Sequence, residues 1–102
     1  MSEARNAAEH RPVVTCEPQD GGWRCTVVIG EDAGATRHEV TVDRETLEDL
    51  APSATPEVLV AESFAILLER EPRESIMRRF ELPIIGRFFG DYPDEIRRRL
   101  AS

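Results

Sequence analysis

Apolar side chains recur at helical spacing between residues 55 and 70, and the other elements are expected to pack against this stretch. The stripe consists of Val60, Ala61, Phe64, Leu67 and Leu68. Thr55 is a favourable N-cap residue, and Pro56 suits the first position of a helix. Pro72 disfavours helical backbone in the residue before it, so the helix is expected to end near Arg70. We therefore predict a helix over residues 55–70 that has neighbours on more than one side.

The chain before this helix alternates between apolar and polar residues, which is the pattern of β-strands. Asp20-Gly21 is a strong signal for a type I′ turn, and a two-residue loop here sets which residues of the flanking strands face each other. The facing pairs on the apolar side are then Pro18 with Trp23, Cys16 with Cys25, and Val14 with Val27. A later run places His38, Val40 and Val42 on one side of a third strand. These patterns predict a three-stranded antiparallel meander over about residues 13–18, 23–30 and 36–42.

Helix-starting residues precede each of the remaining segments. Asp43 is placed to cap a short helix, and prolines 72, 83 and 93 each open a short segment with apolar side chains. Gly90 is placed to end the second of these segments. We predict an α+β fold with four to five helices, over about residues 43–51, 55–70, 72–80, 83–89 and 93–100. Residues 12–102 are predicted to form a single domain and residues 1–11 a flexible tail.

Composition and charge narrow the possible functions. The 102-residue chain is 40% apolar and 32% charged, as is ordinary for a globular protein. Its net charge of −7 argues against general binding of nucleic acid and against contact with an anionic membrane surface. Residues 1–12 lack the apolar core of a signal peptide, and no apolar run approaches the length of a membrane span. We therefore expect a cytoplasmic protein with no membrane contact and no cofactor.

Cys16, Cys25 and His38 form the first candidate site, because the predicted strand register places all three on one face. A Cys–His pair can act as a nucleophile, and thiolates with an imidazole can bind a metal. The spacing of the cysteines is not that of a zinc finger, and His10, the other histidine, lies in the predicted tail. Buried thiols beside a core histidine are the more common interpretation, so this site is the least favoured alternative. The pattern leaves open whether the cysteines are thiols or a cross-strand disulfide.

Arginines concentrate toward the end of the chain and form the second candidate site. They are Arg78, Arg79, Arg87, Arg97, Arg98 and Arg99. On short helices they could gather into a patch that binds phosphate or nucleic acid. Acidic residues are interspersed among them, and no phosphate-binding loop or base-stacking motif accompanies them. Binding of phosphate or nucleic acid through these arginines is therefore an alternative hypothesis.

Apolar residues near the C-terminal end form the third candidate site. Adjacent apolar side chains cannot all point the same way on a short helix, so one side of the segment either enters the core or forms a docking surface. The predicted anchors of such a surface are Ile85, Phe88, Phe89 and Tyr92, and its charged rim is Arg79 and Arg87. Our leading hypothesis is therefore a small non-enzymatic domain that binds a protein partner or forms a homo-oligomer.

Three stretches carry a resemblance to a known group of proteins. They are RHEVTV (37–42), LLEREPRESIMRRFELPIIGRFF (67–89) and DYPDEIRRRL (91–100). This pattern resembles a group of small uncharacterised bacterial proteins of the actinobacterial type. Since that group has no assigned activity, the resemblance implies the boundaries of the elements and no functional residue.

Overall fold

The alternating residues of the first half of the chain form the predicted hairpin and third strand. The computed structural model describes residues 11–31 and 33–101, so the predicted tail lies, apart from Arg11, outside the described residues. The strands are β1 (Val13–Gln19), β2 (Gly22–Ile29) and β3 (Thr36–Asp43), and each is antiparallel to the next. The register of β1 and β2 is the predicted one, with Cys16 opposite Cys25. The hydrophobic alternation therefore predicted correctly which residues face each other.

The turn of this hairpin has two residues, as predicted, but it is not of type I′. A type I′ turn requires positive φ at both central residues, whereas Gly21 has φ of 78° and no described non-glycine residue has positive φ. Positive φ at the second position alone is the pattern of a type II turn. Asp20 thus avoids the left-handed conformation, and glycine alone adopts it.

The long helix α3 (Pro56–Arg70) confirms the prediction from its flanking residues. The hydroxyl oxygen of Thr55 accepts a hydrogen bond from the backbone N–H of Val58 at 3.2 Å, and Pro56 is the first helical residue. The backbone becomes extended at Glu71, immediately before Pro72. The shorter helix α2 (Arg44–Leu50) precedes it, also as predicted, although the side chain of its N-cap residue Asp43 forms no capping hydrogen bond.

The prediction of a helix over residues 72–80 is wrong. This segment contains one turn of 3₁₀ helix, η1 (Arg73–Ser75), and then a short strand, β4 (Arg79–Glu81), which pairs with β3 in parallel. The backbone N–H of Glu39 donates to the carbonyl of Arg78 at 2.7 Å. The free edge of β3 offers unpaired backbone groups, and an extended segment satisfies them as a helix cannot. The sheet therefore has four strands and is mixed, in the order β1-β2-β3-β4.

The last two predicted helices are present, but the α-helical part of the first one is shorter than predicted. The predicted helix over 83–89 consists of a 3₁₀ turn, η2 (Leu82–Ile84), and one α-helical turn, α4 (Ile85–Phe88). Phe89 ends it in extended backbone, and Gly90 does not adopt the positive φ of a glycine cap. The final helix, α5 (Tyr92–Leu100), begins one residue before the predicted bound.

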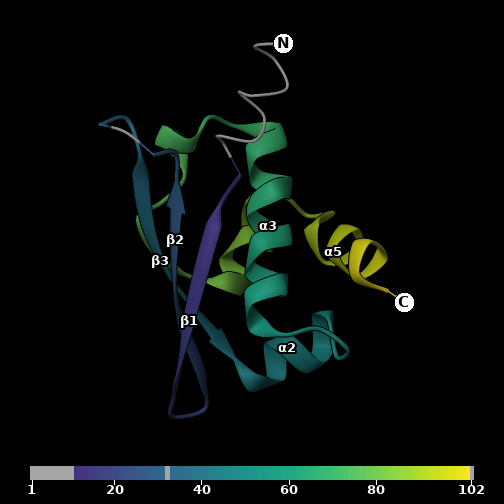
Figure 1. Ribbon diagram of the computed structural model, residues 1–102. Coiled ribbons are helices and arrows are strands. Elements are labelled where there is room, and N and C mark those ends of the chain that lie inside the picture. Colours follow the sequence, from purple (N-terminus) through teal and green to yellow (C-terminus); the bar gives the residue numbers. More distant parts are fainter. Residues whose placement is uncertain (1–10, 32, 102) are drawn as a thin grey trace.

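The core lies on both sides of α3. One side of the helix covers the sheet and contacts β1 and β2, while α5 packs against its other side (Figure 1). Leu59, Val60, Phe64 and Ile66 are fully buried in this position. The prediction that α3 has neighbours on more than one side is therefore confirmed, and its wide apolar stripe is explained by two packing partners.

Two buried hydroxyl groups join α3 to α5. The Ser63 hydroxyl donates to the carbonyl of Leu59 at 2.8 Å, so the Tyr92 hydroxyl, 2.7 Å from Ser63 Oγ, is the donor of the second hydrogen bond. Both side chains are at most 1% exposed. Burial raises the pKa of Tyr92 to about 12, which keeps the phenol neutral in this contact.

Replacing these two residues is expected to have unequal effects. Ser63→Ala leaves the buried Tyr92 hydroxyl without a partner and should cost about 2 kcal/mol of unfolding free energy. Tyr92→Phe leaves Ser63 bonded to Leu59, so it should cost about 1 kcal/mol. The double variant should be no less stable than Ser63→Ala alone, since it removes the orphaned group. Urea unfolding of the three variants measures this order, and a Tyr92→Phe cost larger than that of Ser63→Ala would contradict it.

Candidate interaction surface

An apolar hollow of about 140 Å³ opens between the C-terminal end of α3, η1 and α4. Its lining is mainly apolar and includes Leu67, Ile76, Phe80, Ile84 and Phe88. Several of these side chains also belong to the core, so the hollow is a place where the core reaches the surface. The segment after α3 supplies most of this lining, from Ser75 in η1 to Phe89 after α4, and Leu67 comes from α3 itself.

Phe88 stands at this hollow with 65% of its surface exposed, the highest value among the large hydrophobic side chains of the described residues. Met77, which the sequence analysis did not select, lines the same hollow and is 40% exposed. Single exposed hydrophobic residues are common, but two beside an apolar hollow form a patch that a partner can cover.

The other predicted anchors are less exposed than Phe88, although Ile85 and Phe89 line the same hollow. Ile85 and Tyr92 are 2% and 1% exposed and belong to the core, so they are not available to a partner. Phe89 is half-buried, and the guanidinium of Arg70 lies 5.1 Å from the centre of its ring. The four apolar residues of the predicted surface are thus divided, and of these only Phe88 is largely exposed.

A second hollow adjoins the first and carries the predicted charged rim. Met77, Phe80 and Ile84 line both hollows, and Arg79 and Arg87 line the second one only. The Arg79 side chain is 82% exposed and lies 3.4 Å from a carboxylate oxygen of Glu39. Such an exposed pair contributes little to stability, so this arginine is available to a partner. We call the two hollows together the groove surface.

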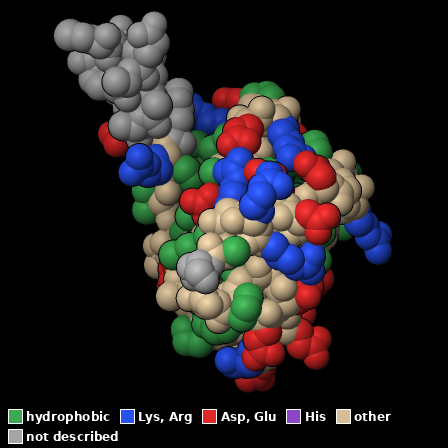
Figure 2. All heavy atoms as spheres, turned by 90° about the vertical axis from the view of Figure 1, so that its right-hand side faces the viewer, with side chains coloured by type: hydrophobic (Ala, Val, Ile, Leu, Met, Phe, Trp, Pro, Cys, Tyr) green, Lys and Arg blue, Asp and Glu red, His purple; other side chains and the backbone are tan. Residues whose placement is uncertain are grey.

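The arginines of α5 do not form the predicted basic patch with the others. Arg97 donates to the Asp49 carboxylate at 3.1 and 3.2 Å, and Arg99 donates to Glu69 at 2.8 and 2.9 Å. Arg98 bonds to Glu95. Basic and acidic side chains consequently alternate over the face that carries α5 (Figure 2). Arg97 and Arg99 join α5 to α2 and α3, and Arg98 pairs within α5, so each of these arginines already has an acidic partner.

The remaining arginines of the second candidate site divide between two places. Arg79 and Arg87 come together at the groove surface. Arg78 and Arg79 line a separate hollow with Arg37 and Thr26, at the edge where β3 and β4 pair. Arg37 was not among the predicted arginines, because Arg78 and Arg79 are distant from it along the chain.

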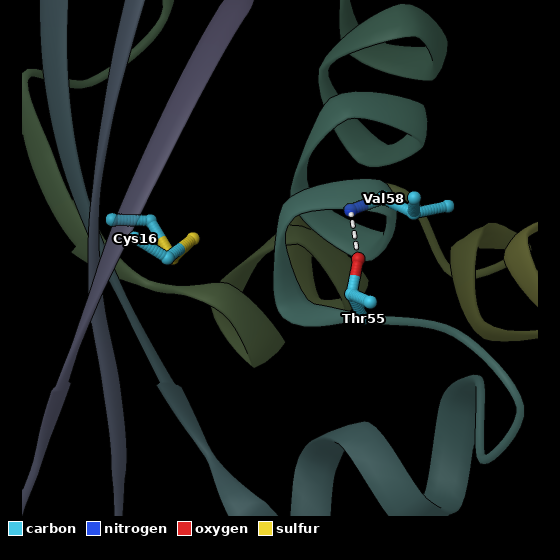
Figure 3. The surroundings of a disulfide bond; sticks show 4 residues. Cys16, Thr55 and Val58 are labelled. Carbon is cyan, nitrogen blue, oxygen red and sulfur yellow. Dashed lines mark hydrogen bonds between the residues drawn. A yellow bond between two sulfur atoms is a disulfide. The ribbon is translucent and has the colours of Figure 1, made fainter.

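Cys16 and Cys25 form a disulfide between β1 and β2, with an S–S distance of 2.05 Å. It lies on the face of the sheet that α3 covers, near the first turn of that helix (Figure 3). A disulfide sulfur is neither a thiolate nucleophile nor a metal-binding thiolate. Among residues 11–31 and 33–101, no three His, Cys, Asp or Glu side chains are grouped so as to hold a metal ion.

Both ring nitrogens of His38 are engaged in hydrogen bonds. The carbonyl of Met77, 2.8 Å from Nδ1, can only accept, so Nδ1 carries the hydrogen. Nε2 therefore accepts from the Thr36 hydroxyl at 3.0 Å. Burial is the main cause that lowers the pKa of this histidine, and the Arg78 charge lowers it further, against the raising effect of the Met77 hydrogen bond. His38 thus holds the segment before β4 against β3 as a neutral ring.

None of the helices in the described part of the chain is long and apolar enough to cross a membrane. The resemblance to small actinobacterial-type proteins stays a prediction. No protein-family model, no curated protein and no solved structure matches this chain.

Proposed function

We propose that this chain is a small non-enzymatic interaction domain that binds a protein on its groove surface. The observation that carries the proposal is Phe88, a phenyl ring 65% exposed at the mouth of an apolar hollow. Burying such a side chain against a partner contributes about 1–2 kcal/mol, and exposed aromatic rings beside pockets are frequent anchors of interfaces. Arg79 and Arg87 at one end add a charged rim that gives orientation.

The state of the other candidate groups supports this choice over the alternatives. The cysteines are joined in a disulfide, and both nitrogens of His38 have partners, so neither group is poised for nucleophilic or acid–base chemistry. The α5 arginines are bonded to acidic residues, which weakens the case for phosphate or nucleic acid. The groove surface is the candidate site whose exposed side chains make the fewest interactions with other described residues.

The sequence predicts a cytoplasmic location, and the presence of a disulfide limits where that prediction can hold. Thiols in the cytosol are normally kept reduced, while disulfides persist in oxidising compartments. We therefore propose a cytoplasmic location only for the reduced form, with the Cys16–Cys25 bond marking exposure to an oxidising environment.

Photo-crosslinking at Phe88 in the source cells tests the proposed function. The variant Phe88→p-benzoylphenylalanine keeps an aromatic ring at the groove surface and is expected to give a discrete crosslinked product on irradiation. Val13→p-benzoylphenylalanine is the matched control, because Val13 is 64% exposed but lies on β1, outside both hollows. If the Phe88 variant gives no product beyond those of the Val13 control, the proposed function is wrong.

A further inference from the structure

The groove surface carries a protruding ring and a hollow in the same patch. Phe88 lines the apolar hollow, and most of its own side chain remains in solvent. Two-fold dimers use the same patch on both copies, so such a patch must be complementary to itself. A ring beside a hollow meets this requirement, because each copy can supply one ring and receive one.

The charges of the groove surface are also arranged so that the surface is complementary to a second copy of itself. Glu71 lines the apolar hollow only, whereas Arg79, Arg87 and Glu81 line the second hollow only. The residues shared by the two hollows lie between these ends. One end therefore carries a single negative charge and the other a net charge of +1. Neither Glu71 nor Arg87 forms an ion pair with another described residue.

We infer that the partner bound by the groove surface is a second copy of this chain. This inference rests on the proposed function and names its partner. A two-fold axis through the shared residues Met77, Phe80 and Ile84 reverses the direction of the surface. It places Phe88 of each copy against the second hollow of the other, which Met77, Phe80, Pro83 and Ile84 line, and brings Glu71 of one copy to Arg87 of the second copy. The Glu71–Arg87 contact then forms twice, as two-fold symmetry requires.

The overall charge of the chain sets the expected strength of this dimer. Each copy carries a net charge of −7, so two copies repel each other at low salt. At physiological ionic strength this long-range repulsion is screened over about 8 Å, whereas contacts within the interface persist. One exposed phenyl ring and one exposed thioether per copy make a small apolar contact. We therefore expect a weak dimer that forms as the protein concentration rises.

Charge exchange between Glu71 and Arg87 tests the inference by sedimentation velocity over a concentration series at physiological salt. Glu71→Arg puts two arginine side chains together at both contacts, and Arg87→Glu puts two glutamates together. Each single variant should weaken the dimer by at least about tenfold. An equimolar mixture of the two single variants should restore it, because one contact of the mixed dimer pairs the two introduced side chains and the other keeps the original pair. The double variant Glu71→Arg/Arg87→Glu should also restore it within one chain.

Two further variants test whether the weakening of the dimer is specific to the groove surface. Glu48→Arg makes the same change in net charge as Glu71→Arg, on the exposed side of α2, and should leave the dimer no weaker. Phe88→Ser should abolish it without unfolding the chain, since the ring is mostly exposed. A dimer that survives Phe88→Ser, or whose single charge variants are not rescued by mixing, overturns the inference.

The outcome also separates this inference from the proposed function. A wild-type chain that stays monomeric at all concentrations overturns the inference. If Phe88 then crosslinks to a different protein, the proposed function stands and the partner is not a second copy. If the wild-type chain is monomeric and Phe88 gives no specific product, both are wrong. A crosslinked product of twice the mass of the chain, together with rescue by charge exchange, supports both.

Discussion

His38→Ala is expected to lower the free energy of unfolding by about 3 kcal/mol, the scale of removing a large buried side chain. The ring is 1% exposed, and its centre lies 5.4 Å from that of Phe64. Its loss removes this packing and leaves the Met77 carbonyl and the Thr36 hydroxyl without their partner. Urea unfolding measures the loss, and amide exchange should show β4 opening before β2.

The pH dependence distinguishes a neutral buried ring from a simple filler of space. Because the folded state lowers the pKa of His38 below its usual value of 6.5, the ring stabilises the fold fully above pH 6.5. This contribution is lost as the pH falls through 6.5 toward the folded pKa, where protonation forces Nε2 to become a donor. Wild type should lose stability in this range and His38→Ala should not. Equal losses in the two proteins would contradict this account. Thr36→Val, which removes one hydrogen bond, should cost only about 1 kcal/mol.

Reduction of the Cys16–Cys25 disulfide is expected to lower the unfolding free energy by about 3 kcal/mol, from the entropy of the short loop that it closes. The bond joins β1 to β2, and among the described strands β1 pairs only with β2. Loss of the bond should therefore raise amide exchange in β1 more than in β3. Urea unfolding with and without a reductant measures the effect.

The variant Cys16→Ala/Cys25→Ala provides the control for that measurement. It should have the reduced stability in both conditions, since the reductant has no bond to break. If the oxidised and reduced wild-type proteins unfold at the same urea concentration, the bond does not constrain the unfolded chain as expected.

Local signals predicted the first two strands and the long helix. The Asp20-Gly21 turn and the alternation around it gave the register that places Cys16 opposite Cys25. Thr55 and Pro56 marked the start of α3. These predictions succeeded because the interactions that decide them lie within a few residues along the chain.

The segment after α3 shows where local signals were insufficient. Ile76 and Phe80 have the spacing of one helical face, and both are buried, yet the chain there is largely extended. What decided between helix and strand was the free edge of β3, together with the hydrogen bond from His38 to Met77. Both partners are distant in sequence, so no pattern within residues 72–80 could reveal them.

The sequence predicted only part of the candidate site, again because segments distant along the chain decide which side chains are exposed. Ile85, Phe88, Phe89 and Tyr92 are alike in being large and apolar, and the sequence predicted only that some of them lie at the surface. Their exposure was decided by the packing of α5 against α3 and α4, which buries Ile85 and Tyr92 and leaves Phe88 in solvent. Met77 joined Phe88 because β4 pairs with β3.

By itself, the sequence determined the hairpin, its register and the bounds of α3, because turn residues, caps and alternation act on neighbouring backbone. The tertiary structure alone decided the fourth strand, the neutral state of His38 and the division of the C-terminal aromatic residues between core and surface. These features depend on which segments, distant along the chain, pack against each other. Burial free energy is gained only when distant segments pack together, and it outweighs the weak local preference of a short segment.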